Sequence, residues 1–384
     1  MGLGAVVLLG LLSAACATRG PVGSAAEERA LQAEVEREER AFLKRVEVYG
    51  DRRLDEYLGG IVARLTDGDV REPRATVVVL LDPTLGAFAM PDGRIYVHTG
   101  LVSRLESEAQ LAAVLAHELA HLREGHARAI GPAAPIPSAD PREHPVLGRT
   151  ARAIVGLELR VAAVAAIEGY GRRLERQADA RALEGLARAG YDPSEAPSAF
   201  ERLGADLEER GPMETLFFGS RQRLAERVAS IRALLAERVP MVRATAASGG
   251  GFEDHVRALV RDNARADVAT GRFALAQLQL ERALASDPTD AIAHLDLGDL
   301  WRLLSQRAAT PAEKAERLAR ARVSYERCLA LDPSRPEPYR QLGFLAYEEK
   351  DVTGAIAWFR RYLAVSPQAP DARRIAEYLA ALER

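Results

Sequence analysis

A regular spacing of glycine, aromatic and proline residues constrains the C-terminal third of this 384-residue chain more than any other feature. Pro333 and Pro367 are 34 positions apart, and Gly343 and Phe359 lie at positions 8 and 24 of a unit that starts at Pro336. Two earlier units carry similar residues: Gly298, Trp301, Ala321, Tyr325 and Pro333 in one, and Ala276, Leu280, Ala283 and Pro288 in the other. A period of about 34 residues predicts stacked pairs of helices with a concave, peptide-binding face.

A second constraint is the stretch 107–128 (SEAQLAAVLAHELAHLREGHAR), in which apolar residues recur at helical spacing. His117 and His121 are four positions apart, so a helix presents both imidazoles to one metal ion. Glu118 follows the first histidine, where its carboxylate can reach a water on that metal. This is the His-Glu-x-x-His arrangement of zinc peptidases, in which zinc makes the water a nucleophile and the carboxylate takes its proton. The alternative is an amphipathic helix with two surface histidines.

Glu175 is the candidate for a third ligand, because a catalytic zinc usually takes three protein ligands. It lies on a predicted helix that continues to Ala189 and stops at Gly190, a residue type favoured just past a helix end. Asp179 is four positions further and shares its face. One of the two carboxylates can therefore bind zinc while the other accepts the outer N–H of a ligating histidine. Taken alone, this arginine-rich segment also fits an ordinary solvated run of charges.

Two further histidines are weaker candidates for the metal. His126 is five positions past His121, so on a continuous helix it points about 140° away and cannot share the ion. We expect His126 beside the site or on the surface. His144 lies in the proline-rich segment 131–145, which predicts a loop and disfavours this residue as a ligand.

Four segments resemble, in this order, metallopeptidase family 48, which includes HtpX, the CAAX prenyl endopeptidases and the periplasmic BepA-type proteases: residues 87–97, 100–101, 108–121 and 175–179. The resemblance covers roughly residues 54–235. It implies one zinc ion per chain and a site of five residues, with His117, His121 and Glu175 as ligands, Glu118 as general base and Asp179 as the partner of a ligand histidine. The C-terminal units likewise resemble tetratricopeptide repeats.

One departure from the family concerns a histidine that approaches the active site in many members. In those members it lies in a Ser/Thr-His-Pro segment before a final helix, and Arg221 stands at the matching position here. Arginine ligates zinc poorly but can stabilise a developing oxyanion. The resemblance therefore suggests an oxyanion or gating role for Arg221.

The N-terminal residues 2–15 are apolar and too few to span a membrane, which is typical of a secretory signal. Cys16 follows small residues, as at a bacterial lipoprotein processing site, and would become the lipidated first residue. An ordinary signal peptide with a chance cysteine is the alternative. Ala17 rather than Asp follows it, so we expect a periplasmic protein held at the outer membrane by its lipid only. Cys328, the other cysteine, occupies a helix-packing position rather than a disulfide.

Together these features predict a mainly α fold of the α+β class: a gluzincin-like zinc peptidase domain with a small β-sheet, followed by an α-solenoid of tetratricopeptide repeats. The expected segments are a signal over 1–16, the peptidase over 17–243, a linker at 244–251 and the repeats over 252–384.

The expected sheet contains a β-branched strand at 76–81 and a hairpin formed by 86–89 and 94–99. We expect the strand at 94–99 to be an edge that holds substrate by main-chain pairing. A purely structural hairpin is the alternative.

The net charge of −3 gives no bulk case for nucleic-acid binding. We expect a zinc endopeptidase that cleaves misfolded or stalled envelope proteins, with repeats that recruit protein clients or an outer-membrane assembly complex. A chaperone-like scaffold with a latent or gated peptidase is the second hypothesis, and a non-peptide metallohydrolase is the third. Glu118 argues for an enzyme, because a pure scaffold has no use for that carboxylate.

Overall fold

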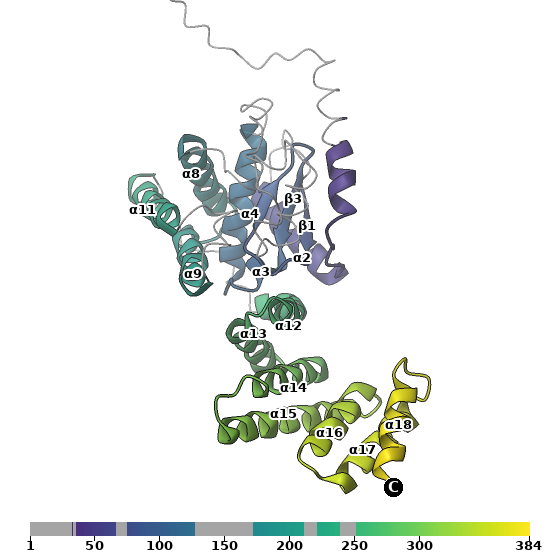
Figure 1. The fold of residues 1–384 in the computed structure, drawn as a ribbon. Coiled ribbons are helices and arrows are strands. Elements are labelled where there is room, and N and C mark those ends of the chain that lie inside the picture. Colours follow the sequence, from purple (N-terminus) through teal and green to yellow (C-terminus); the bar gives the residue numbers. More distant parts are fainter. Residues whose placement is uncertain (1–32, 34–35, 67–74, 127–171, 211–220, 239–250) are drawn as a thin grey trace, which may run out of the picture.

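The computed structural model describes residues 33, 36–66, 75–126, 172–210, 221–238 and 251–384 (Figure 1). The N-terminal part contains α2 (Arg52–Thr66), β1 (Thr76–Leu80), β2 (Ala87–Ala89), β3 (Arg94–His98), α3 (Thr99–Val102), α4 (Glu108–Arg123), α8 (Arg172–Arg188), α9 (Glu195–Arg210) and α11 (Arg221–Arg238). The C-terminal part contains α12 (Phe252–Ala269), α13 (Phe273–Ser286), α14 (Ala291–Ser305), α15 (Pro311–Leu331), α16 (Pro336–Glu348), α17 (Val352–Val365) and α18 (Ala372–Leu382). The predicted fold class, mainly helical with one small sheet, is confirmed.

The three strands form one sheet in the order β1-β3-β2, with β1 parallel and β2 antiparallel to β3. Because side chains alternate between faces, Ala89 and Ile95 enter the core that the sheet shares with α2 and α4. Phe88 and Tyr96 take the other face, where their rings lie 6.0 and 5.4 Å from the ring of Phe42. Phe42 belongs to the helical turns at 36–43, so the sheet is covered on both faces.

β3 is the central strand, so the prediction that residues 94–99 form the substrate-binding edge was wrong. The expected hairpin is present, but β1 arrives from upstream and pairs with the other side of β3. Within the described residues β2 is the strand at the edge on the side of α4, against which it packs.

The main-chain groups of β2 have a defined direction. Met90 N–H donates to the carbonyl of Arg94 over 2.7 Å, so even-numbered residues of this strand bond to β3. In an antiparallel pair the alternate residues point the other way. Ala87 and Ala89 therefore direct their N–H and C=O groups away from β3.

The central helix α4 is bounded by local signals in its own sequence. Ser107 caps its start, since the Ser107 hydroxyl accepts from the N–H of Gln110 over 3.2 Å. The helix ends at Arg123 rather than running to residue 128 as expected. Gly125, at a φ of 63°, takes the left-handed conformation that turns the chain back after the helix. α8 and α9 pack against α4, and α11 packs against both of them.

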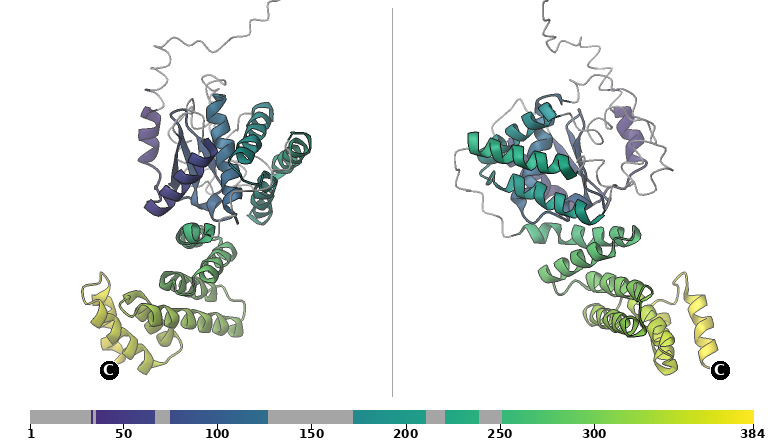
Figure 2. Two further views of the ribbon diagram at one scale, coloured as in Figure 1. Left: turned by 180° about the vertical axis from the view of Figure 1, so that it is seen from behind. Right: turned by 60° about the vertical axis from the view of Figure 1, so that its left-hand side comes forward.

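The C-terminal helices pair as α12–α13, α14–α15 and α16–α17, with α18 closing the stack, as the solenoid prediction required (Figure 2). The glycines of the repeat pattern mark the closest approaches within a pair. A Cβ atom added to Gly298 would lie 2.5 Å from the ring of Tyr325, and one added to Gly343 would lie 2.5 Å from the ring of Phe359. The 34-residue pattern thus records helix packing rather than ligand contacts.

The first helix of the solenoid also completes the core of the N-terminal part. Phe252, Val256, Leu259 and Val260 on α12 are buried in the same hydrophobic cluster as α2, α3 and α4. The ring of His255 stacks on Tyr57 of α2 at a centroid distance of 4.0 Å. The predicted linker at 244–251 lies mostly outside the described residues, but the hydrophobic core continues across it.

A buried polar network seals the same junction. The carboxamide of Asn263 accepts from Thr99 Oγ1 over 2.7 Å and donates to Ser103 Oγ, Asp267 and Gln279. Thr99 and Ser103 belong to the segment that joins β3 to α4, whereas the other partners belong to the first helix pair. All of these polar groups are buried, so a hydrogen bond lost within the network cannot be replaced readily by water.

Replacing Asn263 with Ala is expected to lower the free energy of unfolding by about 1–3 kcal/mol, because several buried partners lose a hydrogen bond. Gln277→Ala is the matched control, since this exposed side chain on α13 bonds only to Glu281 among the described residues. Guanidinium unfolding followed by circular dichroism checks the difference. Equal midpoints for the two variants would contradict the proposed importance of the network.

Candidate active site

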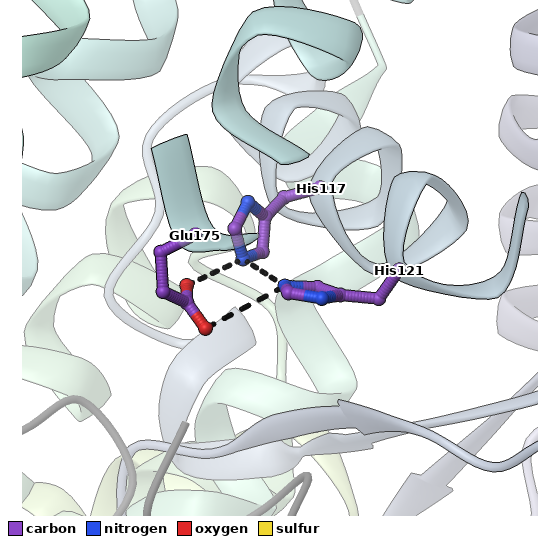
Figure 3. Close-up of side chains that lie close together, drawn as sticks. All are labelled: His117, His121 and Glu175. Carbon is purple, nitrogen blue, oxygen red and sulfur yellow. Dashed lines mark hydrogen bonds and ion pairs between the residues drawn. The ribbon is translucent and has the colours of Figure 1, made fainter. Parts of the chain in front are cut away.

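Three side chains from two helices converge on one point (Figure 3). The Nε2 atoms of His117 and His121, both on α4, are 2.9 Å apart. Glu175 on α8 places one carboxylate oxygen 3.3 Å from Nε2 of His117 and the other 3.7 Å from Nε2 of His121. One donor atom from each of the three lies within 4.8 Å of the others. Spacing within α4 brings the histidines together, and packing of α8 on α4 adds the carboxylate.

The outer nitrogen of His117 meets a second carboxylate. Nδ1 of His117 lies 2.9 Å from Oδ1 of Asp179, one turn along α8 from Glu175. Arg227 on α11 donates to the same oxygen over 2.8 Å, and its guanidinium lies 4.0 Å above the ring of Phe200. Asp179 therefore fixes the proton of His117 on Nδ1, which leaves Nε2 as a ligand atom facing the centre.

The other histidine has an outer contact of its own. Nδ1 of His121 lies 2.9 Å from Nδ1 of His126, which the turn at Gly125 brings back over the end of α4. His126 is 2% exposed and is thus part of the site's surroundings rather than of the surface.

Glu118 lies beside these groups and near the sheet edge. Its carboxylate is buried, and it hydrogen-bonds to the main chain of Ala89 in β2. Burial raises the pKa of Glu118 to about 7, opposed by the charges of His117 and Arg227. A carboxylate that titrates near neutral pH suits proton transfer.

The charges of the converging side chains favour a cation between them. Burial, and then the charge of His117, lower the pKa of His121 to about 4, so its imidazole is neutral near pH 7. Burial opposes ionisation of Glu175, but hydrogen bonds from His117 and His121 hold the pKa of Glu175 well below its usual range. Burial and the charge of Arg227 oppose protonation of His117, but hydrogen bonds with Asp179 and Glu175 raise the pKa of His117 to about 9, so a metal would have to displace a proton from this ring. With that proton displaced, the set offers imidazole nitrogen and an ionised carboxylate, the donors that zinc accepts in catalytic His₂Glu sites with a position left for water.

Two predicted residues, His144 and Cys16, lie outside the described part of the structure, and so does the side chain of Arg221. Of Arg221, the structure gives only the backbone, which begins α11.

Sequence reasoning missed Arg227. Its position within the sequence of α11 could have indicated it. Leu224 and Ile231, three and four positions away, are buried, so Arg227 lies on the apolar face of this helix. A charged side chain on an apolar stripe requires a buried partner, which here is Asp179.

Replacing Arg227 with Lys is expected to lower the free energy of unfolding by about 1.5–3 kcal/mol, because an ammonium cannot reproduce the two-nitrogen contact with the Asp179 carboxylate. The control is Arg232→Lys on the same helix, whose side chain is 62% exposed. Chemical denaturation of the metal-free proteins distinguishes them. A stability equal to that of the control would contradict a structural role for the guanidinium.

Comparison with known families agrees with this geometry. Residues 53–235 match the model of peptidase family M48. This stretch is a peptidase family M48 domain. Residues 261–309 and 311–380 match tetratricopeptide repeat models. The M48 domain contains every side chain of the cluster described above, and the resemblances expected from the sequence are confirmed.

Individual relatives share the peptidase character. A Vibrio cholerae protein that carries the name beta-barrel assembly-enhancing protease is 34% identical over 172 residues, which cover 41% of this chain and 34% of that protein. The mitochondrial metalloendopeptidase OMA1 of Arabidopsis thaliana is 34% identical over 133 residues, 33% of this chain and 25% of that protein. The beta-barrel assembly-enhancing protease of Escherichia coli K12 is 27% identical over 169 residues, 40% of this chain and 33% of that protein. The matched stretches therefore span about a third or less of each relative.

Proposed function

We propose that this chain is a zinc-dependent endopeptidase of the bacterial cell envelope. The observation that carries the proposal is the convergence of His117, His121 and Glu175 beside the buried Glu118, within an M48 domain. The three converging side chains would hold one zinc ion per chain. When bound, zinc supplies the Lewis acidity that activates water and polarises a peptide carbonyl.

In this proposal the protein's own groups carry the proton and orient the substrate. Glu118 takes a proton from water and passes it to the leaving nitrogen, because its carboxylate lies beside the converging side chains at the edge of the sheet. Asp179 holds the ring of His117 in place, and Arg227 holds Asp179. Arg221 remains the candidate for stabilising negative charge on the carbonyl oxygen.

The substrate would lie against β2. The main-chain groups of Ala87 and the carbonyl of Ala89 face away from β3, on the side of α4, and extended peptides bind such edges by adding a strand. The bond from Ala89 to Glu118 ties this edge to the base. A peptide that paired with β2 would therefore lie alongside Glu118.

The repeats would recruit protein clients or an outer-membrane assembly complex. Two points support this part: the helices of the C-terminal part stack in pairs, an arrangement that in repeat proteins forms concave binding surfaces, and two of the relatives are named for enhancing beta-barrel assembly. Misfolded or stalled envelope proteins are the substrates that we propose.

Hydrolysis of casein by residues 17–384, with bound zinc quantified, tests the enzymatic proposal. We expect bound zinc and cleavage that stops when a chelator removes the metal and resumes when zinc is restored. Zinc binding without cleavage would favour the chaperone-like scaffold instead. Absence of zinc from a folded protein would contradict the metal site.

We also propose that Cys16 carries the lipid anchor of a periplasmic, outer-membrane lipoprotein. Among the described residues, none of the helices combines the length and apolar character needed to cross a membrane. Replacing Cys16 with Ser in the full chain removes the proposed site of lipid attachment, so we expect the protein to leave the outer-membrane fraction. Quantitative immunoblotting of fractionated cells checks this, and unchanged membrane association of the variant would contradict the anchor.

A further inference from the structure

The contact between His121 and His126 at the end of α4 involves the ring nitrogen of His121 that the proposed zinc site does not use. His121 points Nε2 toward His117 and Glu175, which leaves Nδ1 on the opposite side of its ring. That atom lies 2.9 Å from Nδ1 of His126, and the two rings are 4.9 Å apart at an interplanar angle of 72°. This separation is that of a hydrogen bond between two imidazoles.

The turn that follows α4 brings His126 into contact with His121. On a continued helix His126 would point about 140° away from His121. Instead the helix stops at Arg123, and Gly125 takes a φ of 63°, which reverses the chain direction within one residue. No atom lies within 4 Å of a Cβ added to Gly125, so a larger side chain would not clash there. Glycine is favoured at this position because of its left-handed backbone conformation.

From this geometry we propose that His126 is a positioning residue for His121, as Asp179 is for His117. The inference rests on the zinc site proposed above. For Nε2 of His121 to bind a metal, the proton of this ring must be on Nδ1. His126 then accepts that proton's hydrogen bond at its own Nδ1, and it carries its own proton on Nε2.

The far side of the His126 ring meets α8. The Gln177 side chain interacts with this ring, and the amide nitrogen of Gln177 donates to Glu124 over 2.6 Å. Glu124 is held in turn by Arg181 over 2.9 Å.

The hydrogen-bond chain has a structural consequence for the metal site. His126 and Glu124 belong to the turn after α4, whereas Gln177 and Arg181 belong to α8, the helix that carries Glu175. Fixing the ring of His121 thus also fixes the end of α4 against α8. His126 itself is not a ligand in this scheme, because its Nδ1 faces the back of His121, away from Glu175.

The test compares two substitutions at one position. Asn places its side-chain oxygen near the place of Nδ1 and keeps an acceptor for His121, whereas Ala removes it. We expect His126→Ala to weaken zinc binding by about 10–100-fold and His126→Asn to recover most of the affinity. Zinc affinity is measured by chelator competition without substrate, and the absorption spectrum of the cobalt-substituted proteins reports ligand geometry. His294→Ala, on α14 of the solenoid, is the control, because His294 contacts the carbonyl of Pro288 and no residue of the site.

Each outcome bears on the proposal. Zinc affinity of His126→Ala equal to that of wild type would overturn the role of His126 alone. Equal losses in the Ala and Asn variants, with equally lowered thermal midpoints of the metal-free proteins, would show that His126 only fills space and would overturn it too. A wild-type protein that binds no zinc would overturn the metal site and this role together.

Discussion

Replacing Glu118 with Gln is expected to lower kcat for peptide hydrolysis by about 10²–10⁴-fold while zinc content stays unchanged. The amide keeps the shape of the carboxylate but cannot take a proton. Because Glu118 is not among the converging donor atoms, its loss leaves the metal site intact. Steady-state cleavage of a fluorogenic peptide, with metal content measured on the same sample, provides both numbers.

The control for this experiment is Glu237→Gln, which removes an exposed carboxylate from α11. We expect wild-type kcat and wild-type zinc content from it. Retained turnover in Glu118→Gln would remove that residue as the base and would direct attention to another proton acceptor. Loss of zinc in the same variant would show instead that the carboxylate helps to hold the metal.

Removing Glu175 is expected to have the largest effect on metal binding. Glu175→Ala takes away one of three donors, so zinc affinity should fall by more than the roughly 10–100-fold that the loss of an outer partner costs. Asp179→Asn supplies that comparison, because Asp179 contacts the outer nitrogen of His117 and is not among the converging donor atoms. The expected order of affinity is wild type, Asp179→Asn, then Glu175→Ala.

Chelator competition at fixed pH measures this series, with Glu184→Gln on the exposed face of α8 as the control. Activity should follow metal occupancy in Glu175→Ala and return in part at high zinc concentration. Stoichiometric zinc in Glu175→Ala at low free zinc would refute Glu175 as a ligand. An affinity of Asp179→Asn below that of Glu175→Ala would reverse the roles of the two carboxylates.

The parts of the site that depend on local spacing could be predicted from the sequence. Four-residue steps along one helix determine which face His117 and His121 share, and the same step relates Glu175 to Asp179. The helix pairs of the solenoid were predictable for a similar reason, because a glycine must lie wherever an aromatic ring from the partner helix fits against the backbone. Gly343 beneath Phe359 is one such place.

The parts that depend on distant segments could not be predicted in this way. The position of β3 in the sheet is decided by β1, which precedes the hairpin and could have paired with either side. Arg227 enters the site because α11 packs on α8, about fifty positions away in the sequence. His126 was expected either beside the site or on the surface, on the assumption of an unbroken helix, whereas the turn at Gly125 places it against His121.

The burial of α12 in the core of the N-terminal part determines where the chain can be truncated or where repeats can be exchanged. A fragment that stops before Phe252 would expose the apolar surface that this helix covers, so we expect a peptidase fragment to require α12 and α13 to remain in solution. Beyond α13, successive pairs contact mainly their neighbours, so helix pairs could be exchanged or added there without disturbing the catalytic half. Under the proposed function, client preference could thus diversify through the outer repeats, while the first pair stays constrained by the M48 domain whose core it completes.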